Sequence, residues 1–405
     1  VKTLHPAIHA GLLAVRNNPE HMKQLEQLGV EPIDMVVINL YPFRATIEKP
    51  GVTFDEAIEN IDIGGPTMLR AAAKNAQDVV VVIDPADYEL VLNELEATGD
   101  VSLKTKRYLQ YKVFEHTAQY DCMIQQYLRG QLEDAPAFPQ NLTVTFEKVQ
   151  EMRYGENPHQ NATFFGDIDR MFDKLNGKDI SYNNMLDIDA AINLIEEFTE
   201  PTFAILKHNN ACGVATRPTL LEAWKDALSG DPVSAFGGVL ICNREVDAAT
   251  AEEINKLFFE VILAPAYSAE ALEILKSKKN RIILLLKDTT RCNKQFRSLL
   301  NGVAVQDRDL KVGGIDGEVR SVTEKQVTDE QMADLIFANK LVKQSKSNAI
   351  VFAKNGMLLA SGIGQTSRVD ALKQAVAKAH SFGFDLKGAV MASDAFFPFS
   401  DCVEL

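Results

Sequence analysis

Residues 203–213 read Phe-Ala-Ile-Leu-Lys-His-Asn-Asn-Ala-Cys-Gly. The abrupt change from apolar to polar residues within this stretch is the strongest indication of the fold. Its first four residues are apolar, which is typical of a short strand buried in a sheet. The run stops at Lys207 and His208, which are side chains that a buried strand excludes. Because ligands in α/β folds collect at the carboxyl ends of strands, the pair is predicted to face a ligand. There the two side chains can move protons and stabilise an oxyanion, although an exposed loop is the simpler alternative.

Short apolar runs alternate with amphipathic stretches on both sides of this peptide. Further strands are predicted at 35–39, 78–83, 238–242, 261–264, 282–286, 349–353 and 389–392, and helices at 86–95, 103–129, 220–228, 250–258, 329–342 and 367–380. The alternation predicts an α/β protein with a mostly parallel or mixed sheet. Residues 130–141 have no helical period and contain two prolines, so they are predicted to link a domain at 1–135 to one at 142–405.

Composition narrows the class of protein. A chain of 405 residues, with 46% hydrophobic and 24% charged residues, predicts a globular enzyme of two or three domains. No apolar run approaches the ~18 residues that a membrane helix needs, and a net charge of −14 argues against a nucleic-acid binder. Five cysteines without a Cys-x-x-Cys pair predict no zinc site, no disulfide framework and a reducing cytosol. The first residue, Val1, and the last, Leu405, suggest a fragment of a longer protein.

The peptide 62–74 has the features of an anion site. Gly64 and Gly65 allow a close turn, and the helix predicted after them would present free N–H groups. Arg70 and Lys74 lie four residues apart on one helix face, where a bound anion would relieve their repulsion. A capped surface helix with two solvated cations is the alternative, and the pattern alone does not separate the two.

Three further polar peptides are candidates for binding. Residues 153–160 gather polar and aromatic types around a glycine, which suits a polar ligand or a long turn. Residues 362–368 form a glycine-rich loop that lacks the third glycine of a dinucleotide fingerprint. Residues 393–401 place three phenylalanines between carboxylates, either as walls for a flat cofactor or as core.

Together these peptides resemble the bifunctional purine biosynthesis family, which fuses an AICAR transformylase to an IMP cyclohydrolase. The resemblance runs, in family order, through residues 1–6, 39–43, 62–74, 153–160, 207–213, 234–238, 364–368 and 393–399. It implies an N-terminal domain of methylglyoxal-synthase-like fold, followed by a larger transformylase region of cytidine-deaminase-like fold. The transformylase moves a formyl group from 10-formyltetrahydrofolate to AICAR, and the cyclohydrolase closes formyl-AICAR to IMP with loss of water.

The same resemblance assigns roles to individual residues. For the cyclohydrolase it implies Lys74 as proton acceptor, and as nucleotide contacts Lys2, Thr3, Asn39, Tyr41, Asp62, Ile63, Gly64 and Gly65. For the transformylase it implies the catalytic pair Lys207 and His208, and as AICAR contacts Arg153, Tyr154, Gly237, Glu260, Asn348 and Phe396. The implied folate contacts are Arg368, Val369, Asp401 and Cys402. It also implies a homodimer with shared transformylase sites. No metal site is expected, and the composition given above predicts neither a nucleic-acid nor a membrane partner.

Two alternatives remain at this point. One is a transformylase with a degenerate cyclohydrolase domain, although Asn39, Tyr41 and Lys74 are all retained. The other is a non-catalytic nucleotide-binding chain, which the intact Lys207–His208 pair disfavours. The chain departs from the family where Asn209-Asn210-Ala211 replaces the Ala-Asn-Pro of bacterial members and where Glu260 replaces an aspartate.

Overall fold

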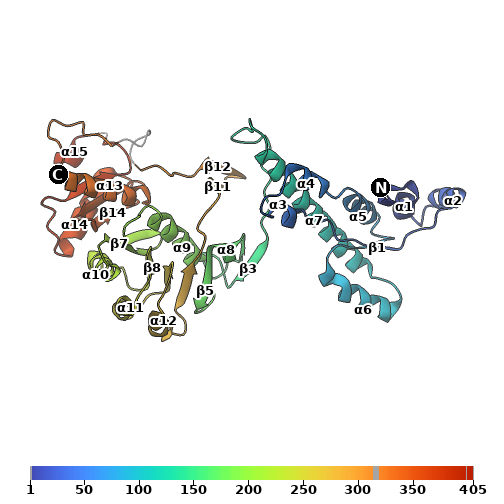
Figure 1. The fold of residues 1–405 in the computed structure, drawn as a ribbon, viewed down its shortest axis with the longest axis horizontal. Coiled ribbons are helices and arrows are strands. Elements are labelled where there is room, and N and C mark those ends of the chain that lie inside the picture. Colours follow the sequence, from blue (N-terminus) through green and yellow to red (C-terminus); the bar gives the residue numbers. More distant parts are fainter. Residues whose placement is uncertain (1, 313–318, 398, 405) are drawn as a thin grey trace. The chain divides into compact units, whose positions relative to one another are not determined.

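The computed structural model describes residues 2–312, 319–397 and 399–404, with Lys2 described by its backbone alone. The chain divides into two compact units, Val1–Thr145 and Phe146–Leu405. Figure 1 shows the ribbon of both units and labels many of their helices and strands.

The first unit is a helical layer around a small parallel sheet. Its elements are η1 (Lys2–Leu4), α1 (Pro6–Leu13), α2 (Pro19–Leu28), β1 (Met35–Val37), α3 (Phe43–Ile47), α4 (Phe54–Glu59), α5 (Gly64–Lys74), β2 (Val80–Val82), η2 (Pro85–Asp87), α6 (Tyr88–Thr98) and α7 (Leu103–Gly130). Strand β1 pairs in parallel with β2, whose three valines are buried against α5 and α7. The predicted strands at 35–39 and 78–83 are confirmed in shortened form. The predicted helix at 103–129 is confirmed as α7, and the one at 86–95 is confirmed as α6 with its start and end shifted toward the C-terminus.

The second unit is built on one large sheet. Its strands are β3 (Lys148–Met152), β4 (Ala162–Phe165), β5 (Phe172–Asn176), β6 (Thr202–Lys207), β7 (Asn210–Thr216), β8 (Val239–Cys242), β9 (Val261–Ala264), β10 (Ile282–Leu286), β11 (Lys294–Leu299), β12 (Gly302–Asp307), β13 (Ile350–Lys354), β14 (Met357–Gly362) and β15 (Val390–Ser393). Within the described chain, nine of them form a sheet in the order β15-β13-β14-β7-β6-β8-β9-β10-β5.

Helices cover both faces of this sheet. The helices are α8 (Ile168–Met171), α9 (Tyr182–Ile195), α10 (Leu220–Gly230), α11 (Ala248–Ile254), α12 (Ala269–Lys276), α13 (Asp329–Lys343), α14 (Arg368–Ser381) and α15 (Asp401–Glu404). Alternate strand residues face opposite layers: Leu206 packs with α9 and α13, whereas Phe203 and Ile205 pack with α10, α11 and α12. Because both faces are covered, β6 is apolar from Phe203 to Leu206, as is typical of a strand with two covered faces.

The sheet is mixed, with more antiparallel pairing than the sequence suggested. Within the described part of this nine-stranded sheet, only β8–β9 and β9–β10 pair in parallel. Strand β7 was not predicted, because it begins with the polar residue Asn210 and contains Gly213. That glycine is required by packing, since a Cβ there would lie 2.0 Å from the Ala227 carbonyl oxygen of α10.

No helix within the described part of the chain is long and apolar enough to cross a membrane.

Candidate active site

The Lys207–His208 peptide forms the turn of the β6–β7 hairpin. Lys207 pairs with Asn210, and the two residues between them, His208 and Asn209, have φ angles of 50° and 65°. Positive φ at both central positions is the mark of a type I′ hairpin turn, and asparagine tolerates it better than most residues. The abrupt end of the apolar run is therefore a tight reversal of the chain, which leaves the His208 side chain exposed at its tip.

Hydrogen bonds fix this turn to helix α9. The backbone N–H of Asn209 donates to Asp187 Oδ1 at 2.6 Å, and the Asn210 side chain donates to the His208 carbonyl at 2.7 Å. Burial raises the pKa of Asp187, against the lowering effects of the Asn209 N–H and of His208. The turn is thus held in place before any ligand binds, which is what a positioned proton acceptor needs.

Lys207 connects the turn to a second loop, 234–238. Its Nζ donates to the Phe236 carbonyl at 2.8 Å, and the N–H of Gly237 donates to the Phe258 carbonyl at 2.8 Å. Gly237 has a φ of 73°, a conformation that favours glycine. The next residue, Gly238, approaches β6 so closely that a Cβ would lie 2.8 Å from the Leu206 carbonyl.

A cavity of about 320 Å³ opens beside the turn, and lysines dominate its charge. It is lined by Lys207, His208, Ser234, Lys346, Gln374 and Lys378, among others. Lys378 pairs with the buried carboxylate of Asp231 at 2.7 Å. Burial alone raises the pKa of Asp231, but hydrogen bonds from Lys378 and Ser234 outweigh burial and lower it.

The other two lysines of this cavity, Lys207 and Lys346, have no ion pair with a carboxylate of the described residues. Unpaired cations that face a cavity attract an anion or a developing negative charge. Lys346 and Lys378 were not predicted as site residues. The signal for Lys346 was its place in the polar peptide Gln344–Asn348, between a predicted helix and a predicted strand.

Cys212 also lines this cavity, yet its thiol is inert. Burial, reinforced by the nearby charge of Asp231, raises its pKa to about 12. A thiol with that pKa is neutral at physiological pH and is not a nucleophile. Among the residues that line this cavity, His208 and the lysines are therefore the groups chemically suited to proton transfer.

A second cavity, of about 340 Å³, brings together five of the predicted substrate and folate contacts. These are Asn348, Arg368, Val369, Phe396 and Asp401. The guanidinium of Arg368 donates to Asn348 Oδ1 at 2.8 Å and to Ser393 Oγ at 2.7 Å, and it pairs with Asp394. Burial opposes ionisation of Asp394, but hydrogen bonds from Ser347, the Ala349 N–H and Arg368 prevail and lower its pKa.

The two cavities share a wall. The N–H of Gly364 donates to the Lys346 carbonyl at 2.9 Å, and the N–H of Asn348 donates to the Gln365 carbonyl at 3.1 Å. Lys346 faces the first cavity and Asn348 the second. A ligand in the second cavity would therefore lie close to the lysine-lined one.

Cys402, the remaining predicted folate contact, packs instead in an apolar cluster with Ile350 and Leu372. Burial raises the pKa of its thiol, and the Asp401 carboxylate adds to the effect. The structure thus places this side chain behind the cavity wall, in the core.

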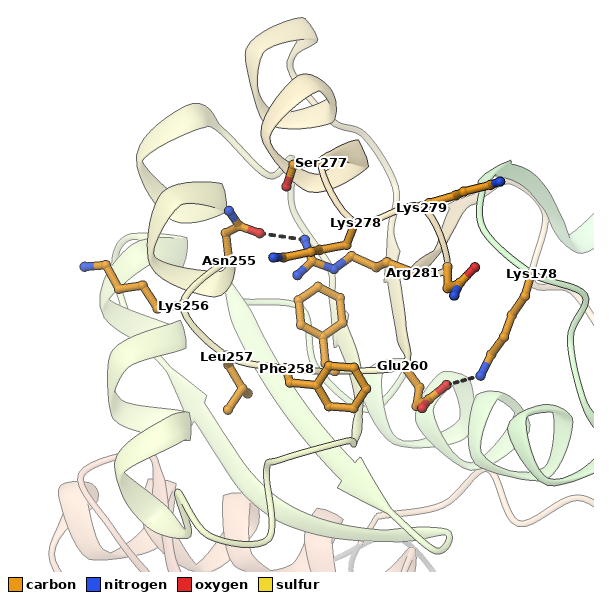
Figure 2. Close-up of a pocket in the computed structure, with 12 residues that line it drawn as sticks. Lys178, Asn255, Lys256, Leu257, Phe258, Glu260, Ser277, Lys278, Lys279 and Arg281 are labelled. Carbon is orange, nitrogen blue, oxygen red and sulfur yellow. Dashed lines mark hydrogen bonds and ion pairs between the residues drawn. The ribbon is translucent and has the colours of Figure 1, made fainter.

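Three predicted AICAR contacts lie apart from both cavities. Glu260 lines a third cavity, of about 620 Å³, and pairs with Lys178 at 2.5 Å (Figure 2). Arg153 and Tyr154 follow β3, where the Arg153 guanidinium lies 5.8 Å from the centre of the Tyr154 ring. Neither residue lines a cavity described above. A single chain therefore does not assemble the whole predicted AICAR set.

In the first unit, the predicted nucleotide contacts gather at the start of α5. A Cβ at Gly64 would lie 2.0 Å from Thr3 Oγ1, and one at Gly65 would lie 2.6 Å from Asp62 Oδ2. The Asp62 carboxylate accepts from the N–H groups of Gly65, at 2.8 Å, and Tyr41, at 3.2 Å. The glycines are thus needed for close packing, and Asp62 already occupies one of the N–H groups that were expected to be free.

The other predicted residues of this unit vary in position. Ile63 is exposed beside the turn, and the Asn39 side chain donates to the Ile83 carbonyl at 3.2 Å, beyond the ends of β1 and β2. Lys74 is the last residue of α5, about 15 Å from Gly64 at the usual helical rise. The structure therefore does not bring Lys74 to the turn, and the side chain of Lys2 lies outside the described residues.

Comparison with known proteins decides the family. The sequence model of the AICARFT/IMPCHase bienzyme family matches residues 72–378, and that of the MGS-like domain matches residues 5–67. The chain belongs to the AICARFT/IMPCHase bienzyme family. Its resemblance to that family and the MGS-like N-terminal domain are thereby confirmed.

Curated relatives agree over the whole chain. The chain is 56% identical to the bifunctional purine biosynthesis protein PurH of Bacteroides thetaiotaomicron, over all of this chain and 78% of that protein. It is 52% identical to PurH of Acetivibrio thermocellus, over all of this chain and 80% of that protein. It is 49% identical to PurH of Bacillus cereus strain B4264, again over 80% of that protein.

Membership of this family makes the protein a bifunctional enzyme of de novo purine biosynthesis, with AICAR formyltransferase and IMP cyclohydrolase activities. Its substrates and product are AICAR, formyl-AICAR and IMP, and its formyl donor is a folate.

Proposed function

We propose that formyl transfer takes place at the β6–β7 turn, with 10-formyltetrahydrofolate as the donor. One observation carries the proposal: Lys207 and His208, held by a fixed turn, face a cavity whose other charged lining is cationic. The donor site is proposed to be the adjoining cavity, where Phe396 offers a largely exposed aromatic face beside Arg368 and Asp401.

The chemistry assigns one task to each member of the pair. The amine of AICAR is a weak nucleophile, since its lone pair is drawn into the imidazole carboxamide. His208 accepts the amine proton as nitrogen attacks the formyl carbon and the new C–N bond forms. Lys207 Nζ, which uses one of its donors on Phe236, donates another to the oxyanion of the tetrahedral intermediate. The bond from the formyl carbon to the folate nitrogen then breaks, and that nitrogen takes up a proton.

A homodimer with shared transformylase sites is part of the proposal. Its support is the separation of the AICAR set within one chain: Asn348 and Phe396 share a cavity, whereas Glu260 and Arg153 stand elsewhere. Apposition of two copies would place groups from both beside one substrate. We also place the enzyme in the cytoplasm, with which five unpaired cysteines agree.

Ring closure is proposed for the domain at residues 1–135, apart from the transformylase domain at 142–405. The proposed nucleotide site combines Thr3, which lies against Gly64, with Asp62, which accepts from the N–H groups of Tyr41 and Gly65. Asn39 and Ile63 are included in the same site. Lys2 and Lys74 are included on the family resemblance. For Lys74 that resemblance is the whole support, given its place at the far end of α5.

Product analysis tests the proposal. The purified chain is incubated with AICAR and 10-formyltetrahydrofolate, and formyl-AICAR and IMP are separated by chromatography. We expect both products from the wild type, and only IMP from pre-formed formyl-AICAR in the Lys207→Ala/His208→Ala variant. Formyl transfer by that variant at the wild-type rate would refute the proposed site, and nucleotide binding without either product would favour a non-catalytic role.

A further inference from the structure

Another cavity of the second unit lies outside the lysine-lined cavity. It has a volume of about 620 Å³ and is lined by the ends of α11 and α12 and the starts of β9 and β10. Five cationic side chains and one carboxylate line it, in a chain whose net charge is −14. The cationic residues are Lys178, Lys256, Lys278, Lys279 and Arg281.

Arg281 is the buried member of this set. It is 5% exposed, and its guanidinium lies 4.2 Å from the centre of the Phe259 ring. One terminal nitrogen donates to Asn255 Oδ1 at 2.8 Å and to the Leu275 carbonyl at 3.0 Å, whereas Nε is buried without a partner. No carboxylate of the described residues pairs with it. A buried, unpaired cation is costly, and an anion beside it would remove much of that cost.

The lysines differ in how they are engaged. Lys178 is bound to Glu260, the one carboxylate of the lining, and Lys256 is bound to Glu253 at 2.6 Å. In Figure 2, Lys256 and Lys279 extend to opposite sides of the cavity, and Arg281 lies between them, joined to Asn255. Lys278 and Lys279 have no ion pair within the described part of the chain. The cavity thus offers a buried guanidinium and two exposed, unpaired ammonium groups.

We propose that this cavity binds an anion of the phosphate class, either free or at the end of a nucleotide. A guanidinium whose Nε has no hydrogen-bond partner can donate to phosphate oxygens, and the lysines add charge at the rim. The inference does not rest on the role proposed for His208, because none of these cations lines the transformylase cavities. The cavity has one residue, Glu260, in common with the proposed AICAR contacts. Inorganic pyrophosphate and ADP serve as probes for the two sources.

Lysine footprinting of the full chain tests the site. The protein is acetylated by a succinimidyl ester with and without pyrophosphate, and modification is measured lysine by lysine by mass spectrometry. We expect Lys278 and Lys279 to be protected, and Lys276, which is exposed just outside the cavity, to react as before. Unchanged labelling of Lys278 and Lys279 under saturating pyrophosphate would overturn the proposal. Protection confined to Lys207 and Lys346 would also overturn it, and would leave the transformylase assignment intact.

Calorimetry of matched lysine variants measures how much the cavity lysines contribute to pyrophosphate affinity. Loss of charge-assisted hydrogen bonds predicts that Lys278→Ala/Lys279→Ala weakens pyrophosphate binding about tenfold to hundredfold. The control, Lys276→Ala/Lys373→Ala, removes two exposed lysines outside the cavity and is expected to bind like the wild type. Equal affinity of the first variant and the control would contradict the proposal.

The identity of the anion is tested by comparing the two probes. Tighter binding of ADP than of pyrophosphate would identify a nucleotide as the source, and tighter binding of pyrophosphate would identify a free anion. Arg281 also ties α11 to α12, so the exposed lysines carry the test.

Discussion

The turn at Lys207–His208 and the turn at Asp62–Gly65 each present polar groups where an element ends, yet they treat charge in opposite ways. At the first, the cation Lys207 is bound only to a carbonyl and faces a cavity. At the second, the carboxylate of Asp62 already accepts the N–H of Gly65 at the start of α5. The first turn keeps its charge available to a ligand, whereas the second satisfies its own donor. A glycine pair before a helix therefore does not by itself show an open anion site.

The largest effect on activity is expected from His208→Ala, which should impair formyl transfer and not the reaction assigned to the Asp62–Gly65 turn. Removing a positioned proton acceptor typically lowers a rate by about 10²–10⁴-fold, so the formyl-transfer kcat should fall within that range. AICAR binding should weaken much less, because the loss is confined to the transition state. Lys207→Ala is expected to do comparable damage, and the double variant less than the product of the two. Steady-state kinetics of formyl transfer measure all three.

Ring closure is the control for those variants. With pre-formed formyl-AICAR as substrate, each of the three should produce IMP at the wild-type rate, because the cyclohydrolase is assigned to the other unit. If His208→Ala left formyl transfer unchanged, or impaired ring closure as severely, the assignment of the pair would be wrong.

A second substitution, Lys74→Ala, tests the other turn. If Lys74 is the proton acceptor of ring closure, its loss should lower the rate of IMP formation by about 10²-fold or more while formyl transfer continues. The measurement is IMP formation from formyl-AICAR, with Lys104→Ala, an exposed lysine of the same unit, as the matched control. A Lys74 variant that closes the ring at the control's rate would show that the far end of α5 takes no part, and would leave the Asp62–Gly65 turn as the site.

The sequence predicted the second unit more completely than it predicted the site. Apolar runs such as 261–264 specify buried strands because both faces of the sheet are covered, and those strands are confirmed. Strand β7 was missed because its packing depends on Gly213 meeting α10, a contact between segments that no local pattern records. The family resemblance named the pair at 207–208, whereas it took the fold to show that Lys346 and Lys378 line the same cavity.

For the first unit the sequence predicted the helices and strands but not which side chains accept hydrogen bonds from which backbone N–H groups. It gave no sign that Asp62 folds back onto the helix that follows, because a carboxylate two residues before a glycine pair can also point to solvent. Similarly, Cys402 lies in a motif with exposed aromatic residues but packs inward, since the short helix α15 turns it toward Leu372.

A third test, with an effect of intermediate size, concerns the ion pair between Arg368 and Asp394 beside the proposed folate cavity. Asp394→Asn removes the partner of Arg368, whose side chain is 10% exposed, and breaking a buried pair of this kind typically costs about 3 kcal/mol of unfolding free energy. Trp224 is the one tryptophan of the chain and is buried in this unit, so its fluorescence reports the unfolding. The exposed Asp370→Asn, in the first turn of α14, is the control and should change stability by less than about 0.5 kcal/mol.

The pH dependence follows from the lowered pKa of Asp394. Since the folded state holds this carboxylate ionised more strongly than the unfolded state does, its contribution is fully present above the unfolded pKa of about 4 and is lost as the pH falls through the lower folded pKa. The wild type should therefore lose more stability than Asp394→Asn when the pH is lowered from about 5 to 3. Parallel stability profiles for the two proteins would contradict the role given to this ion pair.

The smallest effect is expected at Cys212, which lines the transformylase cavity beside Lys207 without sharing its chemistry. With a pKa of about 12, its thiol is ionised in about one molecule in ten thousand at pH 8, so alkylation by iodoacetamide should be very slow. The exposed Cys292 should react in the same sample and serves as an internal control. Cys212→Ala should change the formyl-transfer kcat by less than about threefold, because an inert thiol supplies no nucleophile. Two results would contradict the prediction that the Cys212 thiol is unreactive. One is rapid alkylation of Cys212 in the folded protein, and the other is a large loss of kcat in a stably folded Cys212→Ala variant.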